Sequence, residues 1–285
     1  MQEAQRARRA FIGAWIALTL AKIAVAARLP LFVDEAFYWQ EGRHLAWAYS
    51  DLPGLTAWLA RLGTELGGDR LLALRMPFLA MAAALPWLLV RIAMRAQEDE
   101  AAAWRTGLLA LLLPLSGTLG LMALPDVPMA LATVLCIGAG ARLLRGVDAA
   151  GLAWLAVGLA IGALSHYRFA GTVGAGLIAL LCLSRGRALL KDVRVWAALV
   201  VGAIAWLPLL LWNLHNADAG LRFQLVDRHP WSFQADGWQF LPVQLVLATP
   251  LLFAAMAAAG ARALRPGSAW PPPLRYLSLI HISEP

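Results

Sequence analysis

The chain has 285 residues, of which 61% are apolar and 14% charged, and its mean hydropathy is +0.66. A soluble domain carries about 25% charged residues, so this composition excludes an ordinary soluble protein and indicates a polytopic membrane protein. The net charge of +7 does not indicate nucleic-acid binding, because no basic run is interleaved with stacking aromatic residues in a polar segment. Cys136 and Cys182 lie inside apolar runs, and they indicate neither a disulfide framework nor a metal site.

Long apolar runs predict about eight transmembrane helices, since a bilayer core requires about 20 mostly apolar residues per helix. The runs are continuous rather than alternating in polarity, which favours helices over a membrane barrel. The predicted fold class is therefore all-α, a polytopic membrane helical bundle. The predicted spans cover roughly 10–29, 71–94, 103–123, 127–145, 150–166, 168–184, 194–213 and 239–261. Basic residues at 6–9 precede the first span without an evident cleavage site, which predicts a retained signal-anchor.

The segment between the first two spans predicts two short interfacial helices, at 35–48 and 55–66. Both have apolar residues at helical spacing together with tryptophan, which favours the headgroup level of a bilayer. The residues between them, Ser50-Asp51-Leu52-Pro53-Gly54, are typical of a turn.

Basic residues are more frequent in the loops on the N-terminal side of the predicted bundle than in the loops on the other side. The positive-inside rule therefore predicts a cytoplasmic N-terminus. The segment 30–70, the turns at 123–127 and 165–168, and the loop 214–238 then lie on the outer face. All the unusual polar clusters of the chain fall on that face.

The last nine residues, 277–285, resemble a translated sequencing adapter, and they are excluded from the predicted fold. The predicted domain is therefore 1–276, and the natural protein is expected to continue beyond it.

Asp34 and Glu35 are the first candidates for chemistry, because ionisable groups at the edge of a bilayer are costly unless paired, hydrated or used. The structural alternative is a hydrated helix start, where acidic residues interact favourably with the helix dipole.

Several segments carry a family resemblance. The run Val33-Asp34-Glu35-Ala36-Phe37-Tyr38-Trp39 resembles the first-loop motif of the GT-C glycosyltransferases of family 39, the bacterial membrane enzymes similar to protein mannosyltransferases and lipid A aminoarabinose transferases. The resemblance continues, in the expected order, at 52–59, 72–77, 124–128 and 164–167. Many members have His-Pro-Pro where this chain has Asp51-Leu52-Pro53-Gly54, and Ser-Lys-Tyr where it has Ser165-His166-Tyr167. These departures bear on substrate identity more than on reaction class.

The resemblance implies that a sugar is transferred from a polyprenyl-phosphate donor to an acceptor hydroxyl on the outer face of a bacterial inner (cell) membrane, with inversion. The acceptor would be a lipid, a glycan or a protein. Attack by an alcohol requires a general base, and a partly buried carboxylate can have its pKa raised into the working range. We assign the base to Asp34. Glu35 is expected to orient it or to hold backbone and cationic groups, and base catalysis by Glu35 is the alternative.

The leaving group is a lipid phosphate, so cationic donors should stabilise its developing charge. Arg75 and Arg168 are the candidates, with snorkelling arginines as the alternative. His166 and Tyr167 occupy the family's Ser-Lys-Tyr position, and His166 is either a phosphate donor or a structural histidine. Asp126 is expected to bind the acceptor, to pair with one of the two arginines, or to cap the next helix.

The loop 213–238 contains histidines and acids, but their spacing matches no metal-ligand signature. A solvated loop facing the substrate is predicted, with His229 at the entrance for the acceptor. The sequence identifies no organic cofactor, and it leaves a divalent-metal requirement open.

A transporter or flippase of lipid-linked sugars is the competing class. Transporters place polar residues near the bilayer midplane and often contain inverted repeats, whereas here Lys22 is nearly alone within a span. A catalytically inactive fragment is the third possibility.

Overall fold

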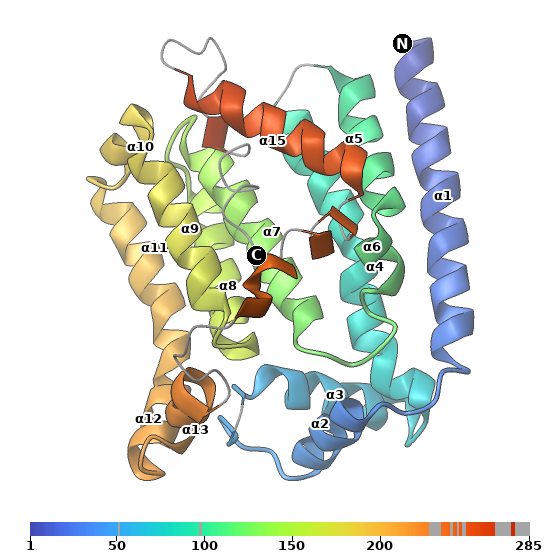
Figure 1. Ribbon diagram of the computed structural model, residues 1–285, viewed down its shortest axis with the longest axis vertical. Helices are drawn as coiled ribbons and strands as arrows, with labels where there is room; N and C mark the ends of the chain where they lie inside the picture. The colour runs from blue at the N-terminus through green and yellow to red at the C-terminus, as the bar shows by residue number, and fades with distance from the viewer. Residues whose placement is uncertain are drawn as a thin grey trace.

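The computed structural model describes residues 1–50, 52–96, 99–227, 235–239, 242–243, 245–246, 249–265 and 275–276 (Figure 1). In these ranges the regular secondary structure is helical, apart from an isolated antiparallel bridge between Ala48 and Pro53. The predicted all-α class is therefore confirmed. The helices are α1 (Gln2–Ala26), α2 (Val33–Arg43), α3 (Leu55–Gly67), α4 (Leu71–Ala96), α5 (Glu100–Leu112), α6 (Pro114–Thr118), α7 (Asp126–Leu143), α8 (Ala149–Ser165), α9 (Phe169–Leu181), α10 (Ser184–Leu189), α11 (Val193–Ala203), η1 (Ile204–Trp206), α12 (Leu207–His215), α13 (Ala219–Arg222), η2 (Phe223–Asp227), η3 (Ala235–Gln239) and α15 (Pro250–Leu264).

The long helices run roughly along one axis and form a bundle (Figure 1). α2 and α3 lie across one end of this bundle, and α12 and α13 lie at the same end. The N-terminus and α10 lie at the opposite end. The segment that the sequence predicts as an outer loop therefore covers one end of the bundle as two helices.

Four segments of the described chain are long and apolar enough to cross a membrane, namely α1, α4, α7 and the continuous stretch Val193–His215. The helices α8 and α9 are apolar but have only 17 and 13 residues, fewer than the roughly 20 that span a bilayer core. The structure thus confirms a multi-pass helical membrane protein, while the predicted number of eight spans is not reproduced.

One predicted span differs from the observed helices, and another lies partly outside the described residues. The span 103–123 is wrong as a single helix, because α5 ends at Leu112 and α6 begins at Pro114. Proline has no N–H group for a helical hydrogen bond and clashes with the preceding turn. Residues 240–241, 244 and 247–248 of the predicted span 239–261 lie outside the described residues, and α15 covers the part of the span from Pro250 onward.

The two short helices predicted between the first spans are confirmed as α2 and α3. The first of them ends at Arg43 rather than at residue 48, because the following segment folds back onto it. The Tyr49 hydroxyl donates to the Glu41 carbonyl at 3.0 Å and accepts from the Ala46 N–H at 3.1 Å. These bonds hold the chain between α2 and α3 as a compact turn.

Two features hold the helices together. Trp87 of α4 packs edge-on against Phe11 of α1 at 4.9 Å and against Trp104 of α5 at 6.0 Å between ring centroids, which joins the three helices. Elsewhere glycines allow close approach of neighbouring backbones, as is usual between membrane helices. A Cβ atom at Gly158 of α8 would lie 3.1 Å from the Ala132 carbonyl of α7.

Candidate functional site

Glu35 of α2 and Arg75 of α4 form a buried ion pair beneath the end of the bundle covered by α2 and α3. The Arg75 Nε donates to Glu35 Oε1 at 2.7 Å, and Nη2 donates to Oε2 at 2.6 Å. Both side chains are 0% exposed. The guanidinium and the carboxylate therefore meet in the two-pronged geometry that gives the strongest ion pairs.

The other polar atoms of this pair hold backbone groups. Arg75 donates to the carbonyls of Ala26, Leu29 and Pro30 at 2.6, 2.8 and 2.9 Å, which lie at the end of α1 and in the turn after it. Glu35 Oε2 accepts from the Phe32 N–H at 3.0 Å, which is the residue before α2. The pair thus ties the end of α1, the start of α2 and the first turns of α4 into one unit.

A further bond connects this unit to the chain before α7. The Ala123 N–H donates to Glu35 Oε1 at 2.8 Å. The loop can reach this position because Gly120 adopts φ +86 and approaches α4 closely, where an added Cβ would lie 3.0 Å from the Phe78 carbonyl. Ala123 is a site residue that the sequence analysis missed, since a backbone donor leaves no mark in the residue types.

The surroundings of Glu35 keep its carboxylate charged. Burial by itself would raise the pKa of Glu35, but the hydrogen bonds from Arg75, Ala123 and Phe32 and the charge of Arg75 outweigh it, and the pKa is lowered. An ionised carboxylate that is fully buried and bonded on both oxygens holds its neighbours in place. This geometry corresponds to the expected role of Glu35 in holding backbone and cationic groups, and it leaves no open oxygen for a reacting hydroxyl.

Asp34 has a different environment from its neighbour. Successive residues of a helix point about 100° apart, so Asp34 faces outward while Glu35 faces the bundle. Its side chain is exposed, and within the described residues no hydrogen bond or ion pair reaches its carboxylate. The expectation of a partly buried Asp34 is therefore wrong. Asp34 is an open carboxylate in the first turn of α2, where the helix dipole favours a negative charge.

Asp126 and Arg168 form a second pair at the same end of the bundle. Arg168 Nη2 lies 3.2 Å from Asp126 Oδ1, and the side chains are 62% and 46% exposed. Of the two partners expected for Asp126, Arg168 is the observed one. Asp126 follows Ala123 by three residues, so a single turn carries both the contact to Glu35 and the Asp126–Arg168 pair.

His166 and Tyr167 position the turn between α8 and α9. The buried His166 accepts the backbone N–H of Arg168 on Nδ1 at 3.0 Å, so a neutral ring carries its proton on Nε2. The Tyr167 hydroxyl accepts from Asn213 Nδ2 at 3.2 Å. These contacts give both residues a positioning role at the base of Arg168.

Asn213 of α12 is a further residue whose importance the sequence analysis missed. It is 1% exposed, and its Oδ1 accepts the Leu221 N–H at 2.8 Å, so it joins α12, α13 and Tyr167. Gly220 makes this junction possible, because a Cβ there would lie 2.7 Å from the Tyr167 hydroxyl and 2.9 Å from the Ser50 carbonyl. An amide at the end of an apolar run is the sequence signal that could have identified Asn213.

Three predicted features remain: His229, a metal site, and contact between Asp34 and the Asp126–Arg168 pair. His229 lies outside the described residues. Across the part of the chain that the structure describes, no group of three or more His, Cys, Asp or Glu side chains could hold a metal ion. In the same part of the chain, Asp34 forms no direct bond to Asp126 or Arg168. The connection is indirect: Glu35, the neighbour of Asp34, is bonded to Ala123, which lies three residues before Asp126.

An apolar groove opens at the same end of the bundle. It lies between the segment 46–48 and α12, has a volume of about 550 Å³, and is lined by Trp47, Leu207, Pro208, Leu211 and Trp212 among others. Trp47 is 73% exposed beside it, although its ring meets Trp58 edge-on at 5.7 Å. A groove of this composition suits a hydrocarbon chain.

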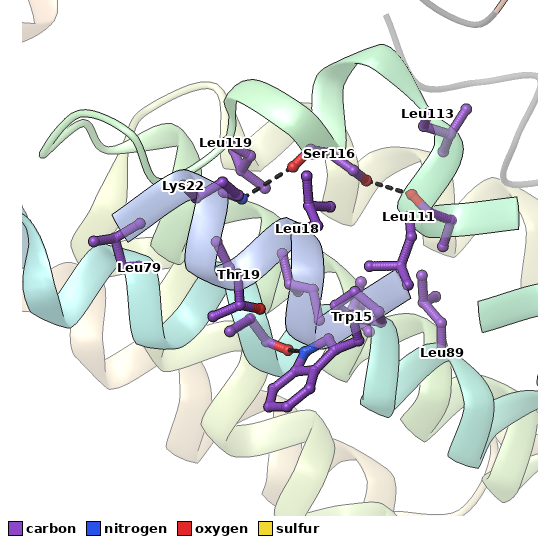
Figure 2. Close-up of a pocket in the computed structure, with 16 residues that line it drawn as sticks. Trp15, Leu18, Thr19, Lys22, Leu79, Leu89, Leu111, Leu113, Ser116 and Leu119 are labelled. Carbon is purple, nitrogen blue, oxygen red and sulfur yellow. Dashed lines mark hydrogen bonds between the residues drawn. The ribbon is translucent and has the colours of Figure 1, made fainter. Parts of the chain in front are cut away.

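Lys22 is the polar residue within a span that a transporter could use. It lies in α1 beside a small cavity of about 110 Å³ between α1, α4 and the α5–α6 break. Figure 2 shows its ammonium directed at Ser116, whose carbonyl accepts from Nζ at 3.0 Å. That carbonyl lies in the short helix α6, so Lys22 satisfies a backbone group where the helix is interrupted, as membrane proteins require.

Comparisons with known proteins show the family of the chain. Residues 51–212 match the family described as dolichyl-phosphate-mannose-protein mannosyltransferase. The matched region contains Arg75, Asp126 and Arg168 and begins after Asp34 and Glu35. The chain is also 33% identical over 243 residues to lipid A galacturonosyltransferase RgtD of Rhizobium johnstonii. That match covers 82% of the chain and 50% of the relative, so the chain spans about half the length of this curated protein. No solved structure matches the chain.

Proposed function

Because the chain belongs to the dolichyl-phosphate-mannose-protein mannosyltransferase family, we propose that it is a membrane glycosyltransferase of the GT-C type. The donor is a polyprenyl-phosphate sugar, and the acceptor is a hydroxyl group of a lipid, a glycan or a protein. The observation that carries this proposal is an exposed Asp34 in the first turn of α2, anchored by the buried Glu35–Arg75 pair next to it.

The proposed reaction is a single displacement. The acceptor oxygen forms a bond to the anomeric carbon, the bond from that carbon to the phosphate oxygen breaks, and the electron pair leaves with the lipid phosphate. Asp34 accepts the proton of the acceptor hydroxyl. One displacement at the anomeric carbon inverts its configuration, so an inverted product is expected.

Arg168 is the proposed partner of the departing phosphate. Its side chain is 62% exposed, and one nitrogen, Nη2, forms an ion pair with Asp126 Oδ1 at 3.2 Å. Several of its five N–H donors therefore remain accessible to a ligand. Arg75 does not take this role in the proposal, because its guanidinium is bonded to Glu35 and to three backbone carbonyls. Arg75 positions α2, and α2 positions Asp34.

The apolar groove between segment 46–48 and α12 supports a donor with a long hydrocarbon chain. The groove is lined by α12, which lies at the same end of the bundle as α2, the helix of Asp34; this suits a carrier whose phosphate lies near the polar residues. The excess of basic residues in the loops at the N-terminal end supports a cytoplasmic N-terminus in a bacterial inner membrane, with the reaction on the outer face.

Reconstitution tests the proposed function. The chain, and a version extended to the length of its relative, would be placed in liposomes with polyprenyl-phosphate-linked hexose, hexuronic acid or pentose. We expect a labelled sugar to pass to lipid, glycan or peptide acceptors, and nucleotide sugars not to replace the lipid-linked donor. Movement of the intact lipid-linked sugar across the bilayer without transfer would instead support a flippase. Addition of a chelator in the same assay determines whether a divalent metal is required.

The Arg168 proposal predicts a selective loss of activity. Arg168→Gln should lower kcat/KM for the donor by about 10- to 100-fold, since hydrogen bonds to charged groups contribute about 1.5–3 kcal/mol. The free energy of unfolding should change by at most about 1 kcal/mol, because the pair with Asp126 is exposed. Steady-state kinetics and thermal unfolding measure the two effects.

Arg222→Gln is the matched control for this variant. Arg222 is an exposed arginine of α13 at the same end of the bundle, 3.8 Å from Asp227. It should retain nearly full activity. An equal loss in the two variants would contradict a specific role for Arg168.

A further inference from the structure

A cavity lined by arginine and apolar side chains lies at the end of the bundle away from α2 and α3. It is formed by the last turn of α4, the last turns of α7, the loop after α7 and the first turns of α8, and its volume is about 420 Å³. Figure 1 places this end of the bundle with the N-terminus, opposite the end that carries α2. The cavity combines the apolar side chains Ile92, Val147 and Trp154 with the arginines Arg95, Arg142 and Arg145.

Among the residues that line the cavity, one acid, Asp148, faces these arginines, and Arg142 is hydrogen-bonded to it. Arg142 Nε lies 2.7 Å from both Asp148 carboxylate oxygens, and Nη2 also bonds to it. The Asp148 carboxylate additionally accepts the Gly151 N–H at 2.8 Å and caps α8. The bond from Arg142 holds the pKa of Asp148 at about 2. Asp148 is therefore a structural group that neutralises one of the three arginines.

The other two arginines are Arg95 and Arg145. Arg95 lies over the ring of Trp154, with its guanidinium carbon 5.4 Å from the ring centroid. A stacked guanidinium keeps all five of its N–H donors in its plane. Within the described residues, neither Arg95 nor Arg145 forms a hydrogen bond or an ion pair with an acid. Among its described residues the cavity thus carries two guanidinium groups without a bonded acid, although the charge of Asp148 also acts on Arg95. The ring of Trp154 holds Arg95 in orientation.

The position of the cavity indicates the kind of ligand that it binds. The cavity lies at the ends of α4, α7 and α8, where arginine and tryptophan side chains meet the interface of a bilayer. Guanidinium groups match phosphate with paired hydrogen bonds, and basic pockets between membrane helices on the cytoplasmic side hold anionic lipid headgroups. The apolar wall of Ile92, Val147 and Trp154 suits the glycerol and upper acyl region of the same molecule.

We propose that this cavity binds the phosphate headgroup of an anionic membrane phospholipid, with Arg95 and Arg145 as its phosphate donors. The site is separate from the proposed sugar-transfer site at the other end of the bundle. Its occupation does not depend on the proposed function, and its test requires no measurement of transfer.

The experiment measures lipid binding to the purified full chain. Native mass spectrometry would compare phosphatidylglycerol with phosphatidylcholine, in the presence and absence of inorganic phosphate. We expect retained phosphatidylglycerol on the wild-type chain. The double variant Arg95→Gln/Arg145→Gln should bind it roughly thirty-fold more weakly, since each basic residue near a membrane surface contributes about 1 kcal/mol.

The matched control is Arg185→Gln/Arg187→Gln. Both of these arginines lie in α10 at the same end of the bundle, both are exposed, and neither lines the cavity. This variant removes the same charge and should keep lipid binding within about twofold of the wild type, because the proposed phosphate donors remain. Equal weakening in the two double variants would show diffuse attraction and overturn the proposal.

Two other outcomes would also overturn it. Displacement of the lipid by millimolar inorganic phosphate would identify a site for a soluble anion. Equal binding of phosphatidylcholine and phosphatidylglycerol would show that the headgroup charge is not recognised. Thermal unfolding in phosphatidylcholine checks the fold of each variant, and the single variant Arg145→Gln provides an intermediate reduction if the double variant is poorly folded.

Discussion

Replacing Asp34 with asparagine is expected to abolish most sugar transfer while leaving the protein folded. The amide keeps the size of the side chain but cannot accept the proton of an attacking hydroxyl. General base catalysis contributes about 10²- to 10⁴-fold, so kcat should fall by that factor, with little change in the donor KM. Single-turnover transfer from a polyprenyl-phosphate sugar measures the effect directly.

The fold of this variant is expected to be unchanged because Asp34 is exposed and has no bonding partner among the described residues. Glu65→Gln is a suitable control, since Glu65 is an exposed acid of α3 that pairs with Arg61 one turn away. It should retain wild-type activity. If Asp34→Asn keeps most of its activity, the proposed mechanism is wrong even though the family and the fold stand.

Breaking the Glu35–Arg75 pair is expected to have the largest effect on stability. Arg75→Met leaves the Glu35 carboxylate buried without its cation and leaves the carbonyls of Ala26, Leu29 and Pro30 without their donor. Removing one member of a buried ion pair costs about 3–5 kcal/mol. Thermal or denaturant unfolding in detergent should show this loss, and transfer activity should fall as well because α2 loses its anchor.

Three further variants separate the causes. Arg75→Lys should rescue little, since an ammonium cannot reproduce the paired bonds to Glu35. Glu35→Leu combined with Arg75→Met should be more stable than Arg75→Met alone, because no unpaired charge remains buried. Arg105→Met breaks the exposed pair with Glu3 and should cost at most about 1 kcal/mol. A similar cost for Arg75→Met and Arg105→Met would contradict the role of the buried pair.

The same pair predicts how stability depends on pH. The pKa of Glu35 in the folded protein lies below its ordinary value of 4.5, so the unfolded chain takes up this proton first on acidification. The contribution of Glu35 is complete above pH 4.5 and is lost as the pH falls through the lower folded value. The unfolding temperature of the wild type should therefore drop below pH 4.5 more steeply than that of Glu35→Gln.

The sequence by itself determined the class of the protein and indicated the region of the candidate site. Composition and long apolar runs indicated a helical membrane protein, because burial of apolar side chains in lipid depends on residue type alone. The ordered motifs around Asp34, Arg75, Asp126 and His166 indicated a glycosyltransferase family, and the family match over 51–212 agrees. The two short helices after the first span followed from their apolar periodicity.

Only the tertiary structure decided which charged groups are paired and which remain open. In the sequence Asp34 and Glu35 are adjacent acids with the same chemistry, and Arg75 and Arg168 are equivalent candidates for phosphate binding. A rotation of about 100° along α2 places Glu35 against Arg75, 40 residues away, and leaves Asp34 exposed. The break at Pro114 and the backbone donor of Ala123 likewise depend on packing. Such contacts join distant parts of the chain, and no local pattern of residue types encodes them.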